Sequence, residues 1–473
     1  MSLENSEIEK LKKKYLRPPS QMGLARLKTF VLENSPAWLV VALMRRFVTK
    51  SVYQSKRESI TFFQRANVAY GAHRQRRSVR LLRVAFGLLG DEFSRDYSRL
   101  IIGATNQTQL DASRRSALSG EILDATKALP IDGTDATGWY QLSRGLFSVG
   151  YFRAAWVARE NSIELSIREG EAVGAGATAV GRAIQAHLER RNFANVEALL
   201  AKSAGQISET GLRDIRDYLD MMQNKYVMPP LDPNSPNFEA EKLFSELITG
   251  KSVALVGRGS ASGRFGDAID SAETVFRVKY MGREYLGPKE FYGTRCDISQ
   301  FNSLVGFSRL IALGLPQDII AELKLIVCVS EDTEHTVQGK LVLGLSKMGV
   351  TYRATFMSGL RSIFQIVRCR PESLYLYGFD FYSKQELYSS EVLKFLKAGS
   401  LVFNDPYMWK FSGVVSRPEI SAGFCGHDPV SNFCFAQNLY KAGMFEIEPY
   451  GASILALTPY QYVERLEEML GDW

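Results

Sequence analysis

Long apolar runs are absent from this sequence of 473 residues. The best of them, from Ala37 to Met44, stops at Arg45 and Arg46, well short of the roughly 20 apolar residues that a membrane-spanning helix needs. The first residues are polar and charged, without the apolar core of a secretory signal. We therefore expect a cytoplasmic protein that is either soluble or peripheral at a membrane.

Cysteine and histidine are also scarce. The five cysteines all lie in the second half of the chain, and their spacing fits neither a zinc site nor a disulfide framework. We interpret them as reduced thiols, in keeping with a cytoplasmic location. An imidazole that exchanges protons near neutral pH can come from four positions only, namely His73, His187, His335 and His427.

Positive charge is concentrated at the amino-terminal end. Residues 1–100 hold 20 Lys and Arg against 8 Asp and Glu, whereas the whole chain has a net charge of +7. Basic and apolar residues are mixed in SPAWLVVALMRRFVTK, as in a helix that lies in a membrane interface. For residues 1–80 we predict an amphipathic helical segment that binds an anionic membrane surface. Nucleic acid ranks lower because no base-reading motif accompanies the charge, and a solvated helical surface is the alternative.

Residues 81–225 have apolar positions at the three- and four-residue spacing of helices. Two stretches, LFSVGYFRAAWVA and LERRNFANVEALL, match with an offset of 41 residues that aligns Phe152 with Phe193. The match predicts stacked helical hairpins similar to tetratricopeptide (TPR) repeats, and a plain helical bundle is the alternative. A domain of this kind offers a surface to a protein partner.

Four prolines between Tyr226 and Asn237 end the helical pattern and predict a linker at residues 226–240. From 241 to 473, helical segments alternate with short β-type runs, which are SVALVG, TVFRVK, CDISQF, LKLIVCV and SLYLYGF. This alternation predicts an α/β domain with a mostly parallel sheet of the Rossmann type.

The first of these runs leads into a glycine-rich turn at residues 256–263, V-G-R-G-S-A-S-G. Glycine lets main-chain amides approach phosphate or ribose closely, so Gly257, Arg258, Gly259 and Ser260 are candidates for binding a nucleotide. The turn matches neither the dinucleotide-binding G-x-G-x-x-G nor the P-loop. A purely structural turn is therefore the alternative.

The sequence that follows the turn resembles the long sialyl motif of glycosyltransferase family 29, the sialyltransferases. The matching features occur in the family's order, and they are Val256 with Gly257, Gly266, Ile269 with Asp270, Val275 with Arg277, and the triplet Gly293, Thr294 and Arg295. With the later segments, the resemblance extends over residues 251–450. It implies a modified nucleotide-binding fold of the GT-A-like class, with Asp270, Gly293 and Thr294 as supporting residues.

Two later segments resemble the short and very short sialyl motifs of the same family. In SGLRSIFQIVRCRPESLYLYGFDF, Ser358 and Gly359 open a helix whose positive N-terminal end favours an anion. In GHDPVSNFCFAQNLYKAG, His427 stands where the family has its general base, and Asn432 stands where it has a glutamate. The resemblance thus implies that His427 is the base, with His335 or Asp380 next in line.

Two departures from the family add positive charge, because Arg258 and Lys279 occupy positions where asparagine is expected. With Arg277 they are candidate donors to a phosphate or carboxylate, and a structural role is the alternative for Arg277. No D-x-D motif follows the linker. We therefore predict no metal and no cofactor, since protein groups can stabilise a CMP leaving group.

Together the motifs imply an inverting glycosyltransferase of polysaccharide biosynthesis. It would move an acidic ulosonic sugar, sialic acid or Kdo, from a CMP-sugar donor to a glycan or glycolipid. One alternative is a transferase that uses another nucleotide-sugar. The other is a helical-repeat adaptor with a catalytically inactive transferase domain, which the departures at Arg258, Lys279 and Asn432 keep open.

Overall fold

The protein's structure is a computed structural model that describes residues 75–89, 95–105, 112–301, 317–328, 336–345, 349–384 and 427–470, together with positions 37, 40, 41 and 62. Within these ranges, positions 204, 206, 236, 281, 284, 285, 338 and 355 are left out. The basic segment predicted to bind a membrane thus lies almost entirely outside the described residues. So do His73, His335 and Cys425.

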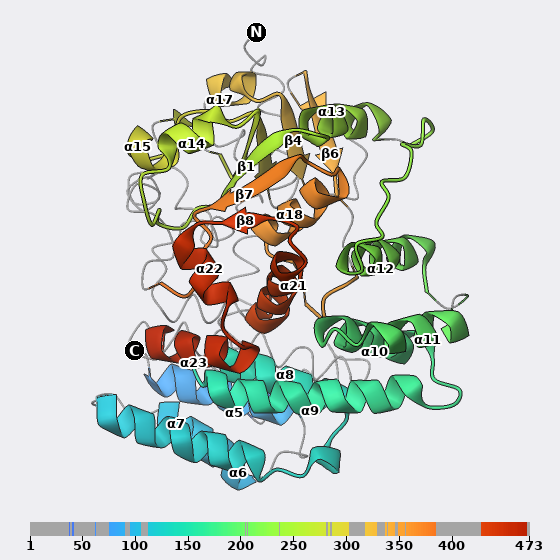
Figure 1. Ribbon diagram of the computed structural model, residues 1–473. Helices are drawn as coiled ribbons and strands as arrows, with labels where there is room; N and C mark the ends of the chain where they lie inside the picture. Colours follow the sequence, from blue (N-terminus) through green and yellow to red (C-terminus); the bar gives the residue numbers. More distant parts are fainter. Residues whose placement is uncertain are drawn as a thin grey trace, which may run out of the picture.

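The first half of the described chain is helical, as its apolar spacing predicts. Its helices are α5 (Gln75–Leu89), α6 (Arg95–Thr105), α7 (Ala112–Lys127), α8 (Ala136–Ser148), α9 (Phe152–Glu171), α10 (Ala177–Glu189), α11 (Phe193–Ser203) and α12 (Glu209–Met222), with a short 3-10 helix, η2 (Ile131–Gly133). The two matched stretches place Phe152 and Phe193 at the first residue of α9 and of α11. Helices α5–α11 stack in a layer below the sheet (Figure 1). Their similarity to TPR repeats stays a prediction.

The second half contains one sheet of eight strands in the order β5-β6-β4-β3-β2-β1-β7-β8. The strands are β1 (Ser252–Val256), β2 (Thr274–Val278), β3 (Ile298–Phe301), β4 (Leu325–Cys328), β5 (Thr336–Val337), β6 (Lys340–Gly344), β7 (Ser373–Tyr377) and β8 (Glu446–Ile447). All neighbours pair in parallel except β5 with β6. The prediction of an α/β region with a mostly parallel sheet is therefore confirmed.

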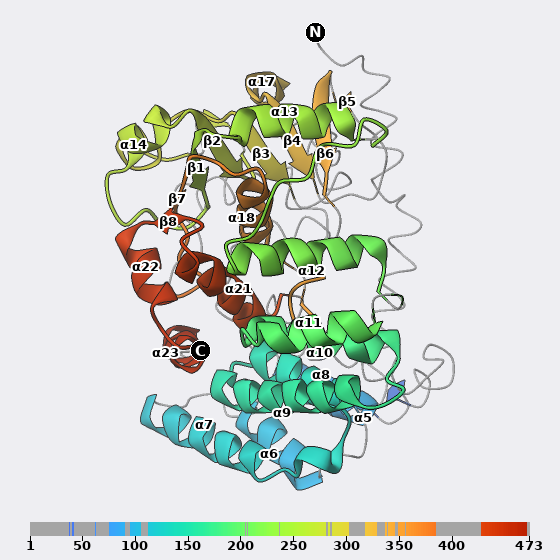
Figure 2. The same cartoon turned by 45° about the vertical axis from the view of Figure 1, so that its right-hand side comes forward.

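Helices cover both faces of this sheet, as parallel strands with continuous apolar sequences require. The helices of this half are α13 (Phe238–Ile248), α14 (Gly266–Ser271), α15 (Lys289–Tyr292), α17 (Gln317–Glu322), α18 (Ser358–Arg368), α21 (Pro429–Lys441), α22 (Pro449–Leu455) and α23 (Pro459–Leu470). Helices α13 and α18 cover the face that carries Leu255 and Phe276, and α14 covers the opposite face with Val256 and Val275. Figure 2 shows α13 lying across the strands.

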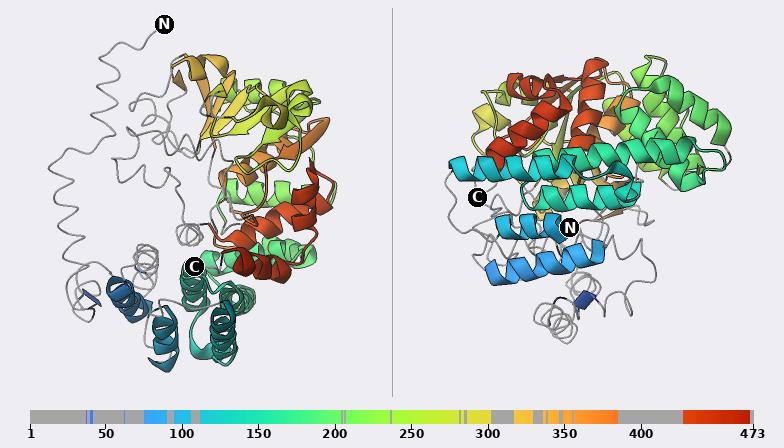
Figure 3. Two further views of the ribbon diagram at one scale, coloured as in Figure 1. Left: turned by 90° about the vertical axis from the view of Figure 1, so that its left-hand side faces the viewer. Right: turned by 90° about the horizontal axis from the view of Figure 1, so that it is seen from below.

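The helical layer and the sheet region share one apolar core. Helix α21 lies between them in both Figure 1 and Figure 2, and Phe435 of α21 stacks on Tyr218 of α12 with ring centroids 5.1 Å apart. The C-terminal helix α23 packs along α9, and Figure 3 shows it against the helical layer. Among the described helices, none combines the length and the apolar character that a membrane span requires.

We expect a fragment of residues 238–473, which lacks helices α5–α12, to lose cooperative folding. In the fragment, the buried side chains of α21 that pack on α10 and α12, Phe435 among them, would face water. Each large side chain that loses its burial costs about 1.5–3 kcal/mol. Thermal unfolding followed by circular dichroism would compare the fragment with the full chain. A cooperative transition of the fragment within a few degrees of the full chain would contradict the shared core.

Candidate active site at the carboxyl edge of the sheet

The order of the strands places a topological switch point between β1 and β7. From β1 the chain continues to β2 on one side, and from β7 it reaches β8 on the other side. Open α/β sheets bind ligands outside the carboxyl ends of their strands at such points. The glycine-rich turn follows β1 directly, so the fold puts the predicted nucleotide-binding turn at this position.

Two glycines of this turn are required by main-chain packing against the loop that follows β7. The N–H of Gly257 donates to the Tyr377 carbonyl at 2.7 Å, and the N–H of Gly259 donates to the Gly378 carbonyl at 3.0 Å. A Cβ atom at Gly259 would lie 2.8 Å from the Gly378 oxygen, and one at Gly257 would lie closer still. These contacts favour the structural alternative for both glycines.

Two charged side chains that sequence reasoning missed hold the turn in place. Glu448, buried at the start of α22, accepts hydrogen bonds from the Gly378 N–H at 2.9 Å and from the Ser262 hydroxyl at 2.7 Å. The Lys384 Nζ donates to the Ser260 carbonyl at 2.8 Å. The Glu-Pro pair at the start of a helix is the local signal of Glu448, but nothing local to it indicates the turn, which lies 186 residues away.

Asp380 faces the same turn from the loop after β7. Its side chain is 8% exposed, and its Oδ2 lies 3.1 Å from the place that a Cβ atom would take at Gly259. The Oδ1 accepts the Tyr382 N–H at 3.0 Å, whereas Oδ2 has no hydrogen-bond partner within the described part of the chain. Burial raises the pKa of Asp380 to about 6. A buried carboxyl with this pKa can exchange protons near neutral pH.

Two positive side chains extend this edge across β1 and β2. Arg258 follows β1 and Lys279 follows β2 directly. Burial, with the charge of Arg258 as a second cause, lowers the pKa of Lys279 to about 7. The backbone of Lys279 has a φ of 56°, in the left-handed region that asparagine adopts more readily than lysine. Asparagine, which the resemblance to the family predicts at this position, would therefore fit this backbone conformation better than lysine does.

Arg277 is directed to main-chain carbonyls. It is 3% exposed, and its guanidinium donates to the carbonyls of Arg295 at 2.6 Å and Tyr292 at 2.7 Å. Burial lowers its pKa, as expected for a cation that has no carboxylate in hydrogen-bond contact among the described residues. This geometry favours the structural alternative for Arg277.

Asp270 organises the Gly-Thr-Arg triplet. It accepts hydrogen bonds from the N–H groups of Thr294 at 2.8 Å and of Arg295 at 2.9 Å. Burial acts to raise its pKa, but the hydrogen bonds from Arg295 and Thr294 outweigh burial and lower the pKa below the usual range. Gly293 has a φ of 64°, and a Cβ atom there would lie 2.5 Å from the Asp270 carboxylate. Asp270, Gly293 and Thr294 thus support the loop before β3.

Helix α18 begins at Ser358, as predicted. Met357 occupies the N-cap position and its own side chain makes no capping hydrogen bond, while its N–H donates to Asn432 Oδ1 at 2.9 Å. Gly359 is required by packing, because a Cβ atom there would lie 2.5 Å from the Phe379 ring. The start of α18 is therefore packed against the loop that follows β7.

His427 lies two residues before α21, next to the N-cap residue Asp428, and is partly buried. Asn432, one turn into α21, accepts the N–H of Met357 at 2.9 Å and donates to the Asp428 carbonyl at 2.8 Å. The amide thus joins the start of α21 to the start of α18. The structure thereby brings the segment of the predicted base next to the helix end predicted to bind an anion.

Two further features bear on ligands. A cavity of about 290 Å³ lies at the opposite edge of the sheet, beside the residues that precede β7 and β8, and no predicted site residue lines it. Among the described residues, no three His, Cys, Asp or Glu side chains come together as a metal site requires. Metal independence stays a prediction. The charged and titratable side chains described above lie at the carboxyl edge of the sheet, so we place the candidate site there and not at the cavity.

Comparison with known proteins gives no relative: no protein-family model matches the chain, and no curated protein or solved structure is significantly similar to it.

We expect Asp380→Asn to stabilise the protein at pH 8 and to have little benefit at pH 4. The pKa of Asp380 in the folded state, about 6, exceeds its ordinary value of 3.8, so the stability that this carboxyl contributes is complete below about pH 4 and is lost as the pH rises through about 6. An amide does not titrate, and the difference should approach about 3 kcal/mol at pH 8.

Urea unfolding at both pH values would measure this difference, with the exposed Asp267→Asn as the matched control. If Asp380→Asn raised the free energy of unfolding equally at pH 4 and pH 8, Asp380 would not titrate as described.

Proposed function

We propose that this protein is an inverting glycosyltransferase that moves an acidic ulosonic sugar, of the sialic acid or Kdo type, from a CMP donor to a glycan or glycolipid. The observation that carries the proposal is the packing of the start of α18 beside the turn after β1, where Gly257 and Gly359 both lie against the Phe379 ring, together with the hydrogen bond that joins Asn432 of α21 to Met357 at that start. The proposal adds the cations Arg258 and Lys279, which follow β1 and β2, and His427, which precedes α21. A GT-A-like architecture is part of the same proposal.

The charges suit a donor of this class, which carries a phosphate and a sugar carboxylate. Arg258 and Lys279 supply positive charge from the loops after β1 and β2, and α18 supplies the positive end of its dipole. Lys279, with a pKa of about 7, takes up a proton as an anion approaches, because an opposite charge favours the charged form. These groups hold the donor and stabilise the departing CMP.

The transfer itself needs one base. The imidazole of His427 takes the proton of the acceptor hydroxyl, and the hydroxyl oxygen forms the new bond at the anomeric carbon of the sugar. The bond from that carbon to the phosphate oxygen breaks, and CMP leaves with the electron pair. Asp380 serves the nucleotide side, where its Oδ2 accepts a hydrogen bond from an N–H or O–H group of the ligand.

The remaining parts of the chain locate the enzyme in the cell. The basic residues 1–80 bind an anionic membrane surface, and the stacked helical hairpins, of the TPR type, receive a protein partner. The enzyme acts in the cytoplasm, at or near the membrane that carries its lipid or glycan acceptor.

We expect CMP to bind more tightly than UMP or AMP in titration calorimetry, and Lys279→Gln to weaken CMP binding more at pH 6 than at pH 8.5. The natural side chain is charged below a pKa of about 7, so its contribution to binding an anion fades above that pH. The exposed Lys289→Gln is the matched control, with the same change of charge. Equal affinity for CMP, UMP and AMP would refute the donor assignment. An effect of Lys279→Gln on CMP binding that does not change with pH would show that Lys279 does not bind the anion.

We expect His427→Ala to lower kcat by about 10²- to 10⁴-fold, the range for loss of a general base, with CMP affinity unchanged. Transfer from CMP-sialic acid and CMP-Kdo to acceptor lipids would be measured between pH 5 and 9. The acidic limb of the natural pH profile reports protonation of the base and should disappear in the variant. Full activity of the variant would place the base elsewhere, with Asp380 as the next candidate.

A further inference from the structure

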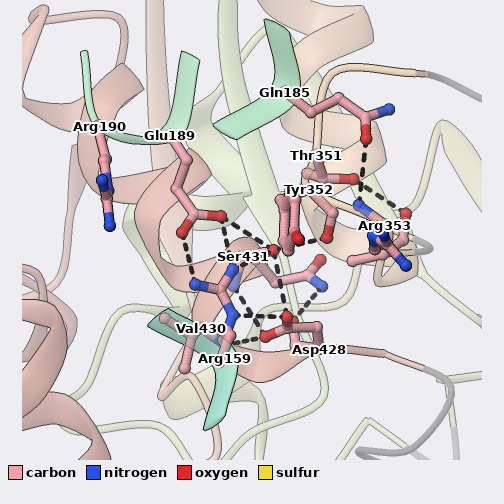
Figure 4. A network of polar contacts seen from close by, with 12 residues as sticks. Arg159, Gln185, Glu189, Arg190, Thr351, Tyr352, Arg353, Asp428, Val430 and Ser431 are labelled. Carbon is pink, nitrogen blue, oxygen red and sulfur yellow. Dashed lines mark hydrogen bonds and ion pairs between the residues drawn. The ribbon is translucent and has the colours of Figure 1, made fainter. Parts of the chain in front are cut away.

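Arg159 of α9 is the centre of a buried polar cluster between the helical layer and the sheet region (Figure 4). The side chain is fully buried. Its Nε donates to Asp428 Oδ2 at 2.7 Å, and its two terminal nitrogens donate to the carboxylate of Glu189 on α10 at 2.7 and 2.6 Å. Nη2 also contacts the Ser431 hydroxyl at 2.6 Å. Burial acts to lower the pKa of Arg159, but Asp428 and Glu189 outweigh it and hold the pKa well above the usual value.

Asp428 uses its two carboxylate oxygens for different tasks. Oδ1 accepts the N–H groups of Val430 at 2.9 Å and Ser431 at 3.1 Å, which caps α21, while Oδ2 accepts the hydrogen bond from Arg159. The capping residue is therefore oriented by the helical layer. It is also the chain neighbour of His427, so its position limits the backbone positions open to that histidine.

A second series of contacts runs from the same cluster to α18. The Ser431 hydroxyl donates to the Tyr352 carbonyl at 3.1 Å, and the Tyr352 hydroxyl contacts the hydroxyls of Ser162 at 2.7 Å and Ser166 at 2.9 Å on α9. One position beyond Ser431, Asn432 holds the main chain at the start of α18. The α9 helix thus reaches the starting ends of both helices at the candidate site.

We propose that Arg159 is a positioning residue for His427, so that the helical layer is a structural part of the site and not only an attached module. The role of His427 as a base rests on the proposed function. The dependence of the position of His427 on Arg159 rests on the contacts described above and not on that function. The guanidinium fixes Asp428, Asp428 fixes the first turn of α21, and the backbone of His427 follows. Sheet residues that contact the nucleotide do not depend on this series.

The chain contains a matched control on the same helix. Arg153 lies six residues before Arg159, and its Nε donates to the Glu467 carboxylate on α23 at 2.8 Å. This contact also joins the helical layer to the C-terminal region, but it does not involve α21. Arg153→Gln therefore loosens the same pair of regions without affecting the cap before His427.

The test uses the full chain with ¹³C-labelled histidine, in which the ring signal of His427 is assigned from the spectrum of His427→Gln. We expect Arg159→Lys to shift or broaden this signal, because a lysine cannot bind Asp428 and both oxygens of Glu189 together. Arg153→Gln should leave it unchanged. The variant Arg159→Gln with Glu189→Gln and Asp428→Asn keeps an amide cap and leaves none of these three charges buried, so it provides a second measurement if Arg159→Lys does not fold.

Kinetics separate a positioning role from general destabilisation. For transfer from a CMP-sugar, Arg159→Lys should lower kcat by about 10- to 100-fold, as small displacements of a reacting group do. CMP affinity should fall by less than kcat, because the start of α18 is the one proposed donor-binding element that this series of contacts reaches. Arg153→Gln should change neither. A His427 signal that is unchanged in both Arg159 variants, or that moves equally in Arg153→Gln, overturns the proposal. If the natural protein does not bind CMP while the His427 signal moves only in the Arg159 variants, the proposed function fails and the positioning role stands.

Discussion

A guanidinium ion cannot be buried without partners, because the loss of its hydration must be offset by charged hydrogen bonds. This requirement unites segments that are far apart in the sequence, since Arg159 of α9 is paired with Glu189 of α10 and with Asp428 of α21. The pairing fixes the first turn of α21 against the helical layer. Through Asn432 it also reaches the start of α18, so both helix ends at the candidate site depend on it.

The residues that resemble sialyl motifs divide into two groups in the structure. Asp270 and Arg277 bind main-chain atoms of the segment from Tyr292 to Arg295, and Asn432 binds main-chain atoms at two helix starts. Arg258, Lys279 and His427 are the motif residues to which the proposed function gives contact with the ligand. Much of the pattern that resembles the family therefore serves to build the edge of the sheet.

The sequence predicts the sheet well because its strands are short apolar runs bounded by turns. The runs containing β1, β2, β3, β4 and β7 and the start of α18 at Ser358 were expected, whereas the two-residue strands β5 and β8 and the strand β6 were not. Two residues give no periodic signal. The partners of Arg159 and Glu448 could not be predicted, because Asp428 and Ser262 lie 269 and 186 residues away and only the folded chain brings them together.

The contact between the loops after β1 and β7 is made by main-chain atoms, and it excludes a Cβ atom at Gly257 and Gly259. Positions 258 and 260 alternate with these glycines and carry side chains. Exchange of Arg258 or Ser260 would alter the charge and shape of this edge, while the main-chain hydrogen bonds keep the path of the loop. If the edge binds a ligand as proposed, its preference among ligands can change at these two positions without any change in the fold.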